Sequence, residues 1–138
     1  FKLYGVKKYN LYLNGLDLTN ASGAAINSQC GKRGRIFVVD GTVNRISDSG
    51  SYTFTTGEDE KGALFSEGQL VFEGSSGELI VNGNYKHAIC SDDYIEVRGG
   101  ILRVPAAVGD GMHVMTPLSF WEELLSSFRV MTEWIARE

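Results

Sequence analysis

The sequence predicts an all-β fold, a parallel β-helix with three short strands in each turn, followed by a single helix. The first observation is a tandem repeat within residues 63–104: Phe65 and Ile89 hold equivalent places 24 residues apart, and Leu79 and Leu102 hold equivalent places 23 residues apart. Repeats of this length are typical of stacked supersecondary units. The second observation is that each short run has apolar residues at alternate positions, the period of a half-buried strand. The third is that glycine or aspartate marks nearly every corner between the runs.

The strands follow from these runs in chain order. Those ahead of the repeat are predicted at 11–18, 25–28, 35–39 and 43–47, and those of the repeat at 63–66, 69–72, 77–81, 88–91, 94–97 and 99–104. Ile26 and Phe65 lie 39 residues apart, about 16 more than one turn needs. The surplus falls at about residues 48–62, which we expect to form a loop inserted at a corner, where solenoids tolerate insertions. Counting back 23 residues from Ile26 reaches Leu3, so an earlier turn is expected at the N-terminus.

The repeat also predicts which side chains meet inside the solenoid. Phe65, Ile89 and Met112 are expected to stack in one internal column, and Leu79 and Leu102 in another. Because strand side chains alternate between two faces, an error of one residue would turn a whole column outward. The burial of Ile89 therefore tests this register.

Beyond residue 113 the pattern becomes that of a helix. Ser119 and Glu122 fit a capping box, and Pro117 fits a first helical turn. We expect one helix from about Pro117 to Ala136. Its apolar stripe recurs at helical spacing and consists of Trp121, Leu124, Leu125, Phe128, Met131 and Ile135.

This helix is expected to cover the open C-terminal end of the solenoid, because the terminal units of a repeat protein need a cap. A helix that binds a partner or a second copy of the chain is the alternative. The predicted organisation is therefore a β-helix domain at 1–116 and a capping helix at 117–138.

Composition and charge narrow the function classes. A chain of 138 residues suits one domain, and 17 glycines against two prolines suit many sharp corners. The net charge of −4 argues against nucleic-acid binding, which needs a clustered basic face. The basic cluster Lys32-Arg33-Gly34-Arg35 is interpreted as a solvated turn. No stretch approaches the roughly 18 apolar residues of a membrane span.

The cysteines and the start of the chain say little about function. Cys30 and Cys90 fall at different places in the repeat, so they are expected to be free, buried thiols rather than a disulfide. The chain opens on Phe1, within a predicted strand, and shows no signal-peptide pattern. The lack of an initiator methionine suggests a fragment of a longer protein.

Carboxylates at the corners suggest a calcium site. Asp92 and Asp93 follow Ser91 at a corner, Asp110 lies between two glycines one turn later, and Glu67 lies near the matching corner one turn earlier. Equivalent residues of adjacent turns lie about 4.8 Å apart, so stacked carboxylates repel unless a cation neutralises them. Calcium takes six to eight oxygen ligands and suits such a corner. The alternative is that aspartate is a favourable turn residue. The acidic run 58–60 is interpreted as a solvated loop.

The sequence offers no strong catalytic motif. It contains no glycine-rich phosphate loop, nucleophile elbow or zinc-ligand spacing. His87 and His113 lie near equivalent corners of successive turns, and neither has a nucleophile in its own motif. A histidine-assisted hydrolase is therefore disfavoured.

One stretch resembles a known family. Residues 84–93 read Asn-Tyr-Lys-His-Ala-Ile-Cys-Ser-Asp-Asp, and residues 109–113 read Gly-Asp-Gly-Met-His. The pattern N-Y-K-H-G/A-I-x-S-x-D-D followed by a D-G-I-H corner is similar to that of the bacterial carbohydrate-binding domain-containing proteins. The resemblance covers about residues 11–113. It departs after His113, where the family continues with an N-D-Y-F strand and several more turns.

The resemblance implies a right-handed parallel β-helix similar to pectate lyases, extracellular or attached to the cell surface. It also implies binding of calcium and of plant-type polysaccharides, acidic ones included. By position, Asp92, Asp93 and Asp110, together with Ser91, are the expected calcium neighbours. Ligand contacts are expected from aromatic and polar side chains, because sugar rings stack on aromatic rings while their hydroxyls need hydrogen-bond partners. These candidates are Tyr85, Lys86, His87 and Tyr94.

Three functions remain open at this point. The favoured one is a non-catalytic, calcium-stabilised carbohydrate-binding module. The second is a polysaccharide lyase of the pectate-lyase kind, in which Arg98, Arg103 or Lys86 would abstract the proton next to a calcium-bound uronate carboxylate. The third is a shortened β-helix that acts as a scaffold.

Overall fold

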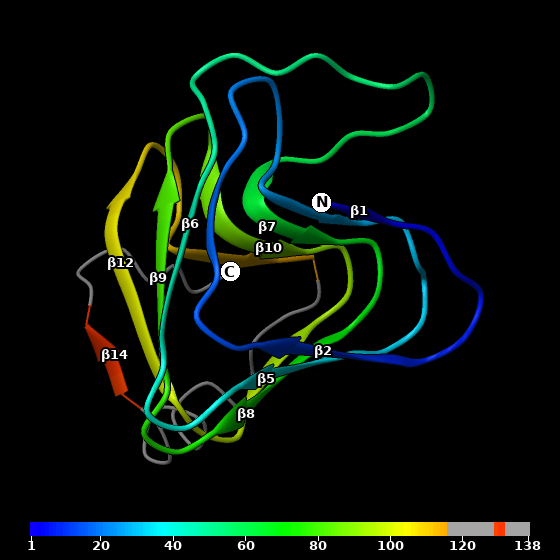
Figure 1. Cartoon of the computed structure of the whole chain (residues 1–138). Helices are drawn as coiled ribbons and strands as arrows, with labels where there is room; N and C mark the ends of the chain where they lie inside the picture. The colour runs from blue at the N-terminus through cyan, green and yellow to red at the C-terminus, as the bar shows by residue number, and fades with distance from the viewer. Residues whose placement is uncertain (116–128, 132–138) are drawn as a thin grey trace.

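Three parallel β-sheets surround one core in the computed structural model, which describes residues 1–115 and 129–131 (Figure 1). Sheet A contains β1 (Lys2–Leu3), β4 (Ile26–Ser28), β7 (Gly62–Ser66), β10 (His87–Ser91) and β13 (Met112–Val114). Sheet B contains β2 (Tyr9–Leu13), β5 (Gly34–Val38), β8 (Leu70–Gly74) and β11 (Ile95–Val97). Sheet C contains β3 (Asp17–Thr19), β6 (Val43–Ser47), β9 (Glu78–Gly83), β12 (Ile101–Ala107) and β14 (Arg129–Met131).

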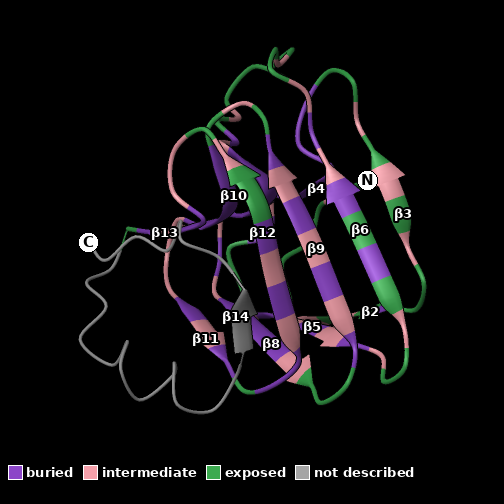
Figure 2. Ribbon diagram, turned by 90° about the vertical axis from the view of Figure 1, so that its left-hand side faces the viewer, coloured by how far each residue is buried: buried purple, intermediate pink, exposed green. Residues whose placement is uncertain are grey.

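The chain visits the three sheets in a fixed order. From β1 to β13 it passes through sheets A, B and C in turn, and every strand pairs in parallel with the strand three elements away. The turns therefore stack side by side, as Figure 2 shows for β3, β6, β9 and β12. This is the arrangement of a parallel β-helix and confirms the all-β, parallel-sheet part of the predicted fold class. Across the described residues, no helix has the length and apolar character that crossing a bilayer requires.

Two secondary-structure predictions, one of a strand and one of a helix, need correction. The run 11–18 was expected to be one strand, but it forms β2 and β3 with a corner between them, where Gly15 has a φ of 85°. The continuous helix predicted over 117–136 is wrong at 129–131, which form β14 beside β12. The edge of sheet C offers unpaired backbone groups, and pairing with β14 satisfies them. The rest of the predicted helix, Trp121 and Phe128 included, lies outside the described residues.

The core consists of columns of aliphatic side chains, one residue from each turn. Ile89 is fully buried and pairs with Leu64 on one side and with Met112 on the other. Leu79 and Leu102 pair as predicted. Phe65 was expected in the Ile89 column, but it pairs with Cys90, so its side chain leaves β7 on the opposite face from Leu64 and lies outside the core cluster. Both cysteines are free and buried, as predicted.

Buried polar side chains hold the corners together. Asn44 is fully buried at the start of β6, and its Oδ1 accepts hydrogen bonds from the backbone N–H groups of Gly15 and Leu16, each at 2.8 Å. Its Nδ2 donates to the Glu78 carbonyl at 3.0 Å. One side chain thus provides hydrogen-bond partners for backbone groups of both the preceding and the following turn.

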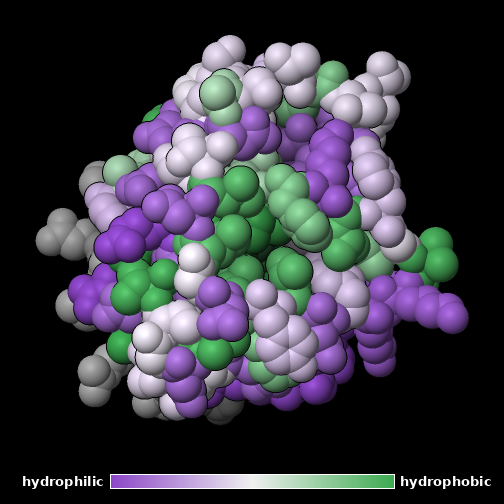
Figure 3. Space-filling model, viewed as in Figure 1, coloured by the Kyte–Doolittle hydropathy of each residue, from purple (hydrophilic) through white to green (hydrophobic). Residues whose placement is uncertain are grey.

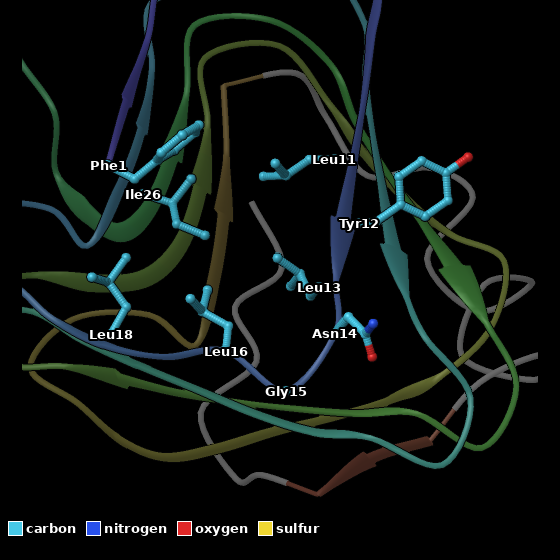
Figure 4. A pocket seen from close by; sticks show the side chains of 9 residues that line it. All are labelled: Phe1, Leu11, Tyr12, Leu13, Asn14, Gly15, Leu16, Leu18 and Ile26. Carbon is cyan, nitrogen blue, oxygen red and sulfur yellow. The ribbon is translucent and has the colours of Figure 1, made fainter.

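The N-terminal end of the solenoid is an open apolar hollow of about 560 Å³. Figure 3 shows it as a hydrophobic depression with a polar rim. In Figure 4 Leu11, Leu13 and Ile26 point into it, whereas Tyr12 points away from it. The apolar interior of the solenoid is therefore open to solvent at the first turn.

Candidate functional site

The corner insertion folds back onto the solenoid through a group of aromatic rings. It leaves after β6 and returns at β7. Tyr52 stacks on Tyr85 with ring centroids 4.1 Å apart, and Phe54 approaches Tyr85 edge-on at 6.1 Å. Asp48, which is buried, accepts hydrogen bonds from the Tyr52 hydroxyl and, at 2.6 Å, from the Asn84 backbone N–H. These contacts fix the loop against the corner between β9 and β10.

A second set of contacts ties the insertion to the first turn. Lys2 Nζ lies 2.7 Å from Glu58 Oε1, and the Tyr4 hydroxyl donates to Glu58 Oε2 at 2.6 Å. The hydrogen bond from Lys2 lowers the pKa of Glu58 from its usual value. The Thr53 N–H donates to the Ser22 carbonyl at 2.8 Å. The acidic run of the insertion is thus held in place at Glu58, rather than solvated as predicted.

A groove of about 380 Å³ lies where the insertion meets the corner before β10, and we call it the corner groove. One side presents aromatic rings: Phe54 is 44% exposed and Tyr85 is half-buried. Lys86 is exposed at its border. The remaining lining residues are Glu58, Asp59, Glu60 and Lys61. Exposed rings beside hydrogen-bonding side chains are the chemistry that a sugar needs, since its ring faces are apolar and its edges polar.

Beside the corner groove lies an acidic cluster formed by Asp59, Glu67 and Asp92. Their carboxylate oxygens lie within 4.8 Å of one another. Lys61 Nζ neutralises part of this charge, at 2.8 Å from Asp92 Oδ1 and 3.9 Å from Asp59 Oδ2. Burial, together with a hydrogen bond from the protonated Glu67 carboxyl to the Asp92 carboxylate, raises the pKa of Glu67 to about 7. The cluster therefore carries more negative charge than Lys61 alone offsets.

The two histidines form a separate cluster with Asp110. The rings of His87 and His113 are stacked, with centroids 4.1 Å apart and planes at 4°. The Asp110 N–H donates to His87 Nδ1 at 2.9 Å, and His113 Nδ1 lies 2.7 Å from Asp110 Oδ2. Burial lowers the pKa of His87 to about 4, so its ring is neutral at pH 7. Because His87 Nδ1 already accepts a backbone hydrogen bond, these contacts define a hydrogen-bonded corner rather than a ready set of metal ligands.

The structure divides the aspartates that were expected to share calcium. Asp92 follows the end of β10 and stacks next to Glu67, as the repeat predicted. Ile89 pairs with Met112, so Asp110 lies level with His87 at the other end of β10. Asp93 lies at the same corner as Asp92, where its N–H donates to Ser91 Oγ at 3.0 Å. Asp110 lies 18 residues after Asp92, whereas Ile89 and Met112 lie 23 residues apart, so the predicted column of Ile89 and Met112 already placed the two aspartates at different ends of the strand.

Of the four residues predicted to contact a ligand, two line the corner groove and two do not. Tyr85 and Lys86 line the corner groove. The side chain of His87 is only 6% exposed, so its ring offers little surface to a ligand. Tyr94 is half-buried at the corner between β10 and β11, where its carbonyl accepts the Leu70 N–H at 3.0 Å.

Several residues of the site were missed because they lie on the insertion. Tyr52, Phe54, Asp59 and Lys61 have no equivalents in the other turns, so the repeat gave no register for them. Their composition was an available signal: two aromatic residues lie inside a stretch that is otherwise rich in serine, threonine, glycine and acids.

Three comparisons relate this chain to known proteins. The family model of the carbohydrate-binding domain-containing proteins matches residues 4–123. A curated protein of that description from Acetivibrio thermocellus is 29% identical over 98 residues, which are 70% of this chain and 34% of that protein. The chain thus spans about a third of this relative.

The third comparison concerns the fold. The structure of a polysaccharide lyase-like protein from C. thermocellum, a gadolinium derivative, superposes with a TM-score of 0.60 at 17% identity and covers 80% of this chain and 58% of that one. At this identity the likeness is one of fold alone. Because the family model matches most of its length, this chain belongs to the carbohydrate-binding domain-containing protein family.

Proposed function

We propose that the protein is a non-catalytic module that binds plant-type polysaccharide, acidic forms included, in the corner groove. The observation that carries this proposal is that the adjoining rings of Phe54 and Tyr85 line the same groove as a set of hydrogen-bonding side chains. Rings held by stacking lose little side-chain freedom when a sugar binds. The family relationship supports a carbohydrate as the ligand, and a setting outside the cell would give access to such polymers.

The acidic cluster is the calcium site in this proposal. Asp59, Glu67 and Asp92 would supply carboxylate oxygens, the ligands that calcium prefers. Burial and the neighbouring Asp92 carboxylate raise the pKa of Glu67, and a bound cation would relieve the repulsion between the two carboxylates. Glu60, a buried lining residue of the corner groove, has one oxygen, Oε2, without a hydrogen-bond partner among the described residues. Bound calcium would neutralise this side of the groove and bridge it to the carboxylate of an acidic sugar.

Two of the three residues proposed as a base for a lyase are engaged elsewhere, whereas the third, Lys86, lies exposed in the corner groove. Arg98 lies on sheet B, with Nε 3.0 Å from Glu96, and Arg103 lies on sheet C, with Nη2 3.2 Å from Glu78. Near the acidic cluster, burial lowers the Lys61 pKa, but the hydrogen bond to Asp92 and the nearby negative charges together outweigh it, so the pKa is raised and the amine stays protonated. A protonated amine cannot abstract a proton, so these contacts favour binding over elimination chemistry.

The test is binding of galacturonate oligomers and of neutral plant oligosaccharides, measured by calorimetry with calcium and with EDTA. Phe54→Ala should weaken binding about tenfold or more, whereas Phe54→Tyr, which keeps the ring, should bind like the unchanged protein. Thermal unfolding of both variants checks that the fold is intact. Equal affinity of Phe54→Ala and the unchanged protein would remove the corner groove from this account, and the absence of binding to every sugar would remove the function.

A further inference from the structure

A second groove lies on the outer face of the first two turns, on sheet B. It has a volume of about 330 Å³ and is lined by Lys8, Tyr9, Asn10, Arg33 and Arg35. Tyr9 pairs with Gly34, so the register places Lys8 level with Arg33 and Asn10 level with Arg35. Adjacent strands lie about 4.8 Å apart, so these cations are stacked closely. We call this surface the basic groove.

The positive charges of the basic groove are largely unopposed. Within the described residues, no carboxylate lies within 4.0 Å of Lys8 or Arg33. Arg33 Nε donates to the neutral side chain of Gln69 at 3.2 Å. Arg35 has one distant partner, Glu73 Oε2 at 4.0 Å. In a chain whose net charge is −4, this is a local reversal of charge, and the sequence reading of the basic cluster as a solvated turn missed it.

An aromatic pair continues the same face beyond the cations. Tyr12 pairs with Phe37, two residues beyond the pair of Asn10 and Arg35, so its side chain leaves the sheet on the same side. The two rings are stacked, with centroids 4.7 Å apart and planes at 12°. Tyr12 is 61% exposed and points away from the core in Figure 4. A large exposed ring beside unopposed cations is a built surface for a ligand that has both an anionic group and an apolar ring face.

We propose that the basic groove binds the uronate residues of an acidic polysaccharide directly, without calcium. The guanidinium groups of Arg33 and Arg35 match a carboxylate in geometry and charge. The exposed ring of Tyr12 would stack on the neighbouring sugar. This inference rests on the proposed function for the class of ligand, but it uses a different face and the opposite charge from the corner groove. One polymer could then contact both faces, which would raise its avidity.

The test is binding of galacturonate oligomers in excess EDTA, which leaves the basic groove as the anion-binding surface. The unchanged protein should bind, and Arg33→Ala and Arg35→Ala should each weaken binding about tenfold or more. Arg45→Ala is the matched control, because Arg45 is an exposed arginine on sheet C, and its binding should be unchanged. Carboxyl-reduced oligomers should bind weakly to the unchanged protein and to all three variants, because they lack the carboxylate that the arginines would bind.

The possible outcomes separate the two proposals. Binding with calcium but not with EDTA would overturn the basic groove and leave the corner groove standing. Binding in EDTA that survives Phe54→Ala and is lost in Arg33→Ala would support the basic groove alone. An equal loss in Arg45→Ala, or equally tight binding of a single-stranded oligonucleotide, would indicate general attraction of polyanions and overturn the uronate site.

Discussion

At the scale of single residues, the core depends on side chains that touch both neighbouring turns. Ile89 is one of these, with Leu64 before it and Met112 after it in the same column. It is fully buried in the cluster that all three sheets share. A cavity left by truncation of this side chain would not be filled by one neighbour without opening a gap beside another, because protein interiors are close-packed.

Ile89→Ala should therefore lower the free energy of unfolding by about 2–5 kcal/mol, the cost of truncating a buried aliphatic side chain. Urea unfolding followed by circular dichroism measures it. Ile80→Ala is the control, because Ile80 is only half-buried on β9, and its loss should be clearly smaller. Equal losses at the two positions would mean that the column does not behave as a packed interior.

The titration of Glu67 makes the stability of the fold depend on pH. Its pKa is raised from 4.5 to about 7 in the folded protein. Between these values the folded state keeps a proton that the unfolded state has released, so this contribution to stability is present at low pH and is lost as pH rises through about 7. In EDTA, the Tm of the unchanged protein should fall more between about pH 5 and about pH 8 than that of Glu67→Gln.

Calcium should reverse this fall, because a ligand that binds only the folded state stabilises it by mass action. Scanning calorimetry of the unchanged protein at the higher pH, with calcium and with EDTA, shows the difference. Identical melting curves under the two conditions would remove calcium from the acidic cluster.

At the scale of elements, the corners determine how closely successive turns approach. Gly77 precedes β9, and a Cβ added there would lie 2.5 Å from the Val39 carbonyl oxygen and 2.6 Å from that of Val38. Both atoms belong to the backbone of the preceding turn, which cannot rotate away as a side chain can. This glycine thus allows close stacking of two turns rather than an unusual backbone conformation.

Gly77→Ala should destabilise the protein by about 1–3 kcal/mol, the usual cost of overpacking. Gly31→Ala is the matched control: a Cβ at Gly31 meets nothing within 4 Å, so its effect should be near zero. Urea unfolding of the two variants compares them directly. A neutral Gly77→Ala would show that the two turns can separate without cost.

The same corners explain what the sequence could and could not predict. Alternating apolar residues predicted the strands of the repeat, because the two-residue period can be read within a single strand without knowledge of its partners. The misplacement of Phe65 by one residue arose where Ala63, Leu64 and Phe65 are all buried, so neither face was marked as polar. The contact between Tyr52 and Tyr85 joins an insertion to a distant corner, and no local pattern encodes such a pairing.

At the scale of the whole molecule, the solenoid is a row of turns in which each turn contacts its neighbours. The stability of such an array is approximately a sum over turns and over the interfaces between them. The first turn has one such interface, and its leucines, Leu11 and Leu16 among them, border the apolar hollow at the N-terminal end. The middle turns have two interfaces, and β7 and β10 are buried along their whole length.

This gradient should appear in hydrogen exchange, because backbone amides open locally with free energies that follow local burial and contact. Peptides that cover β7 and β10 should exchange about tenfold or more slowly than those that cover β2 and β3, which would correspond to about 1.4 kcal/mol of extra local stability in the middle turns. Exchange followed by mass spectrometry at two pH values checks that opening is in rapid equilibrium. Ala substitution at Leu16 serves as the control, since it should speed exchange in the first turn and leave β10 unchanged. Uniform protection from β2 to β10 would instead mean that the array unfolds as one cooperative unit. The interfaces between turns would then be strong enough to cancel the difference in burial between the first turn and the middle turns.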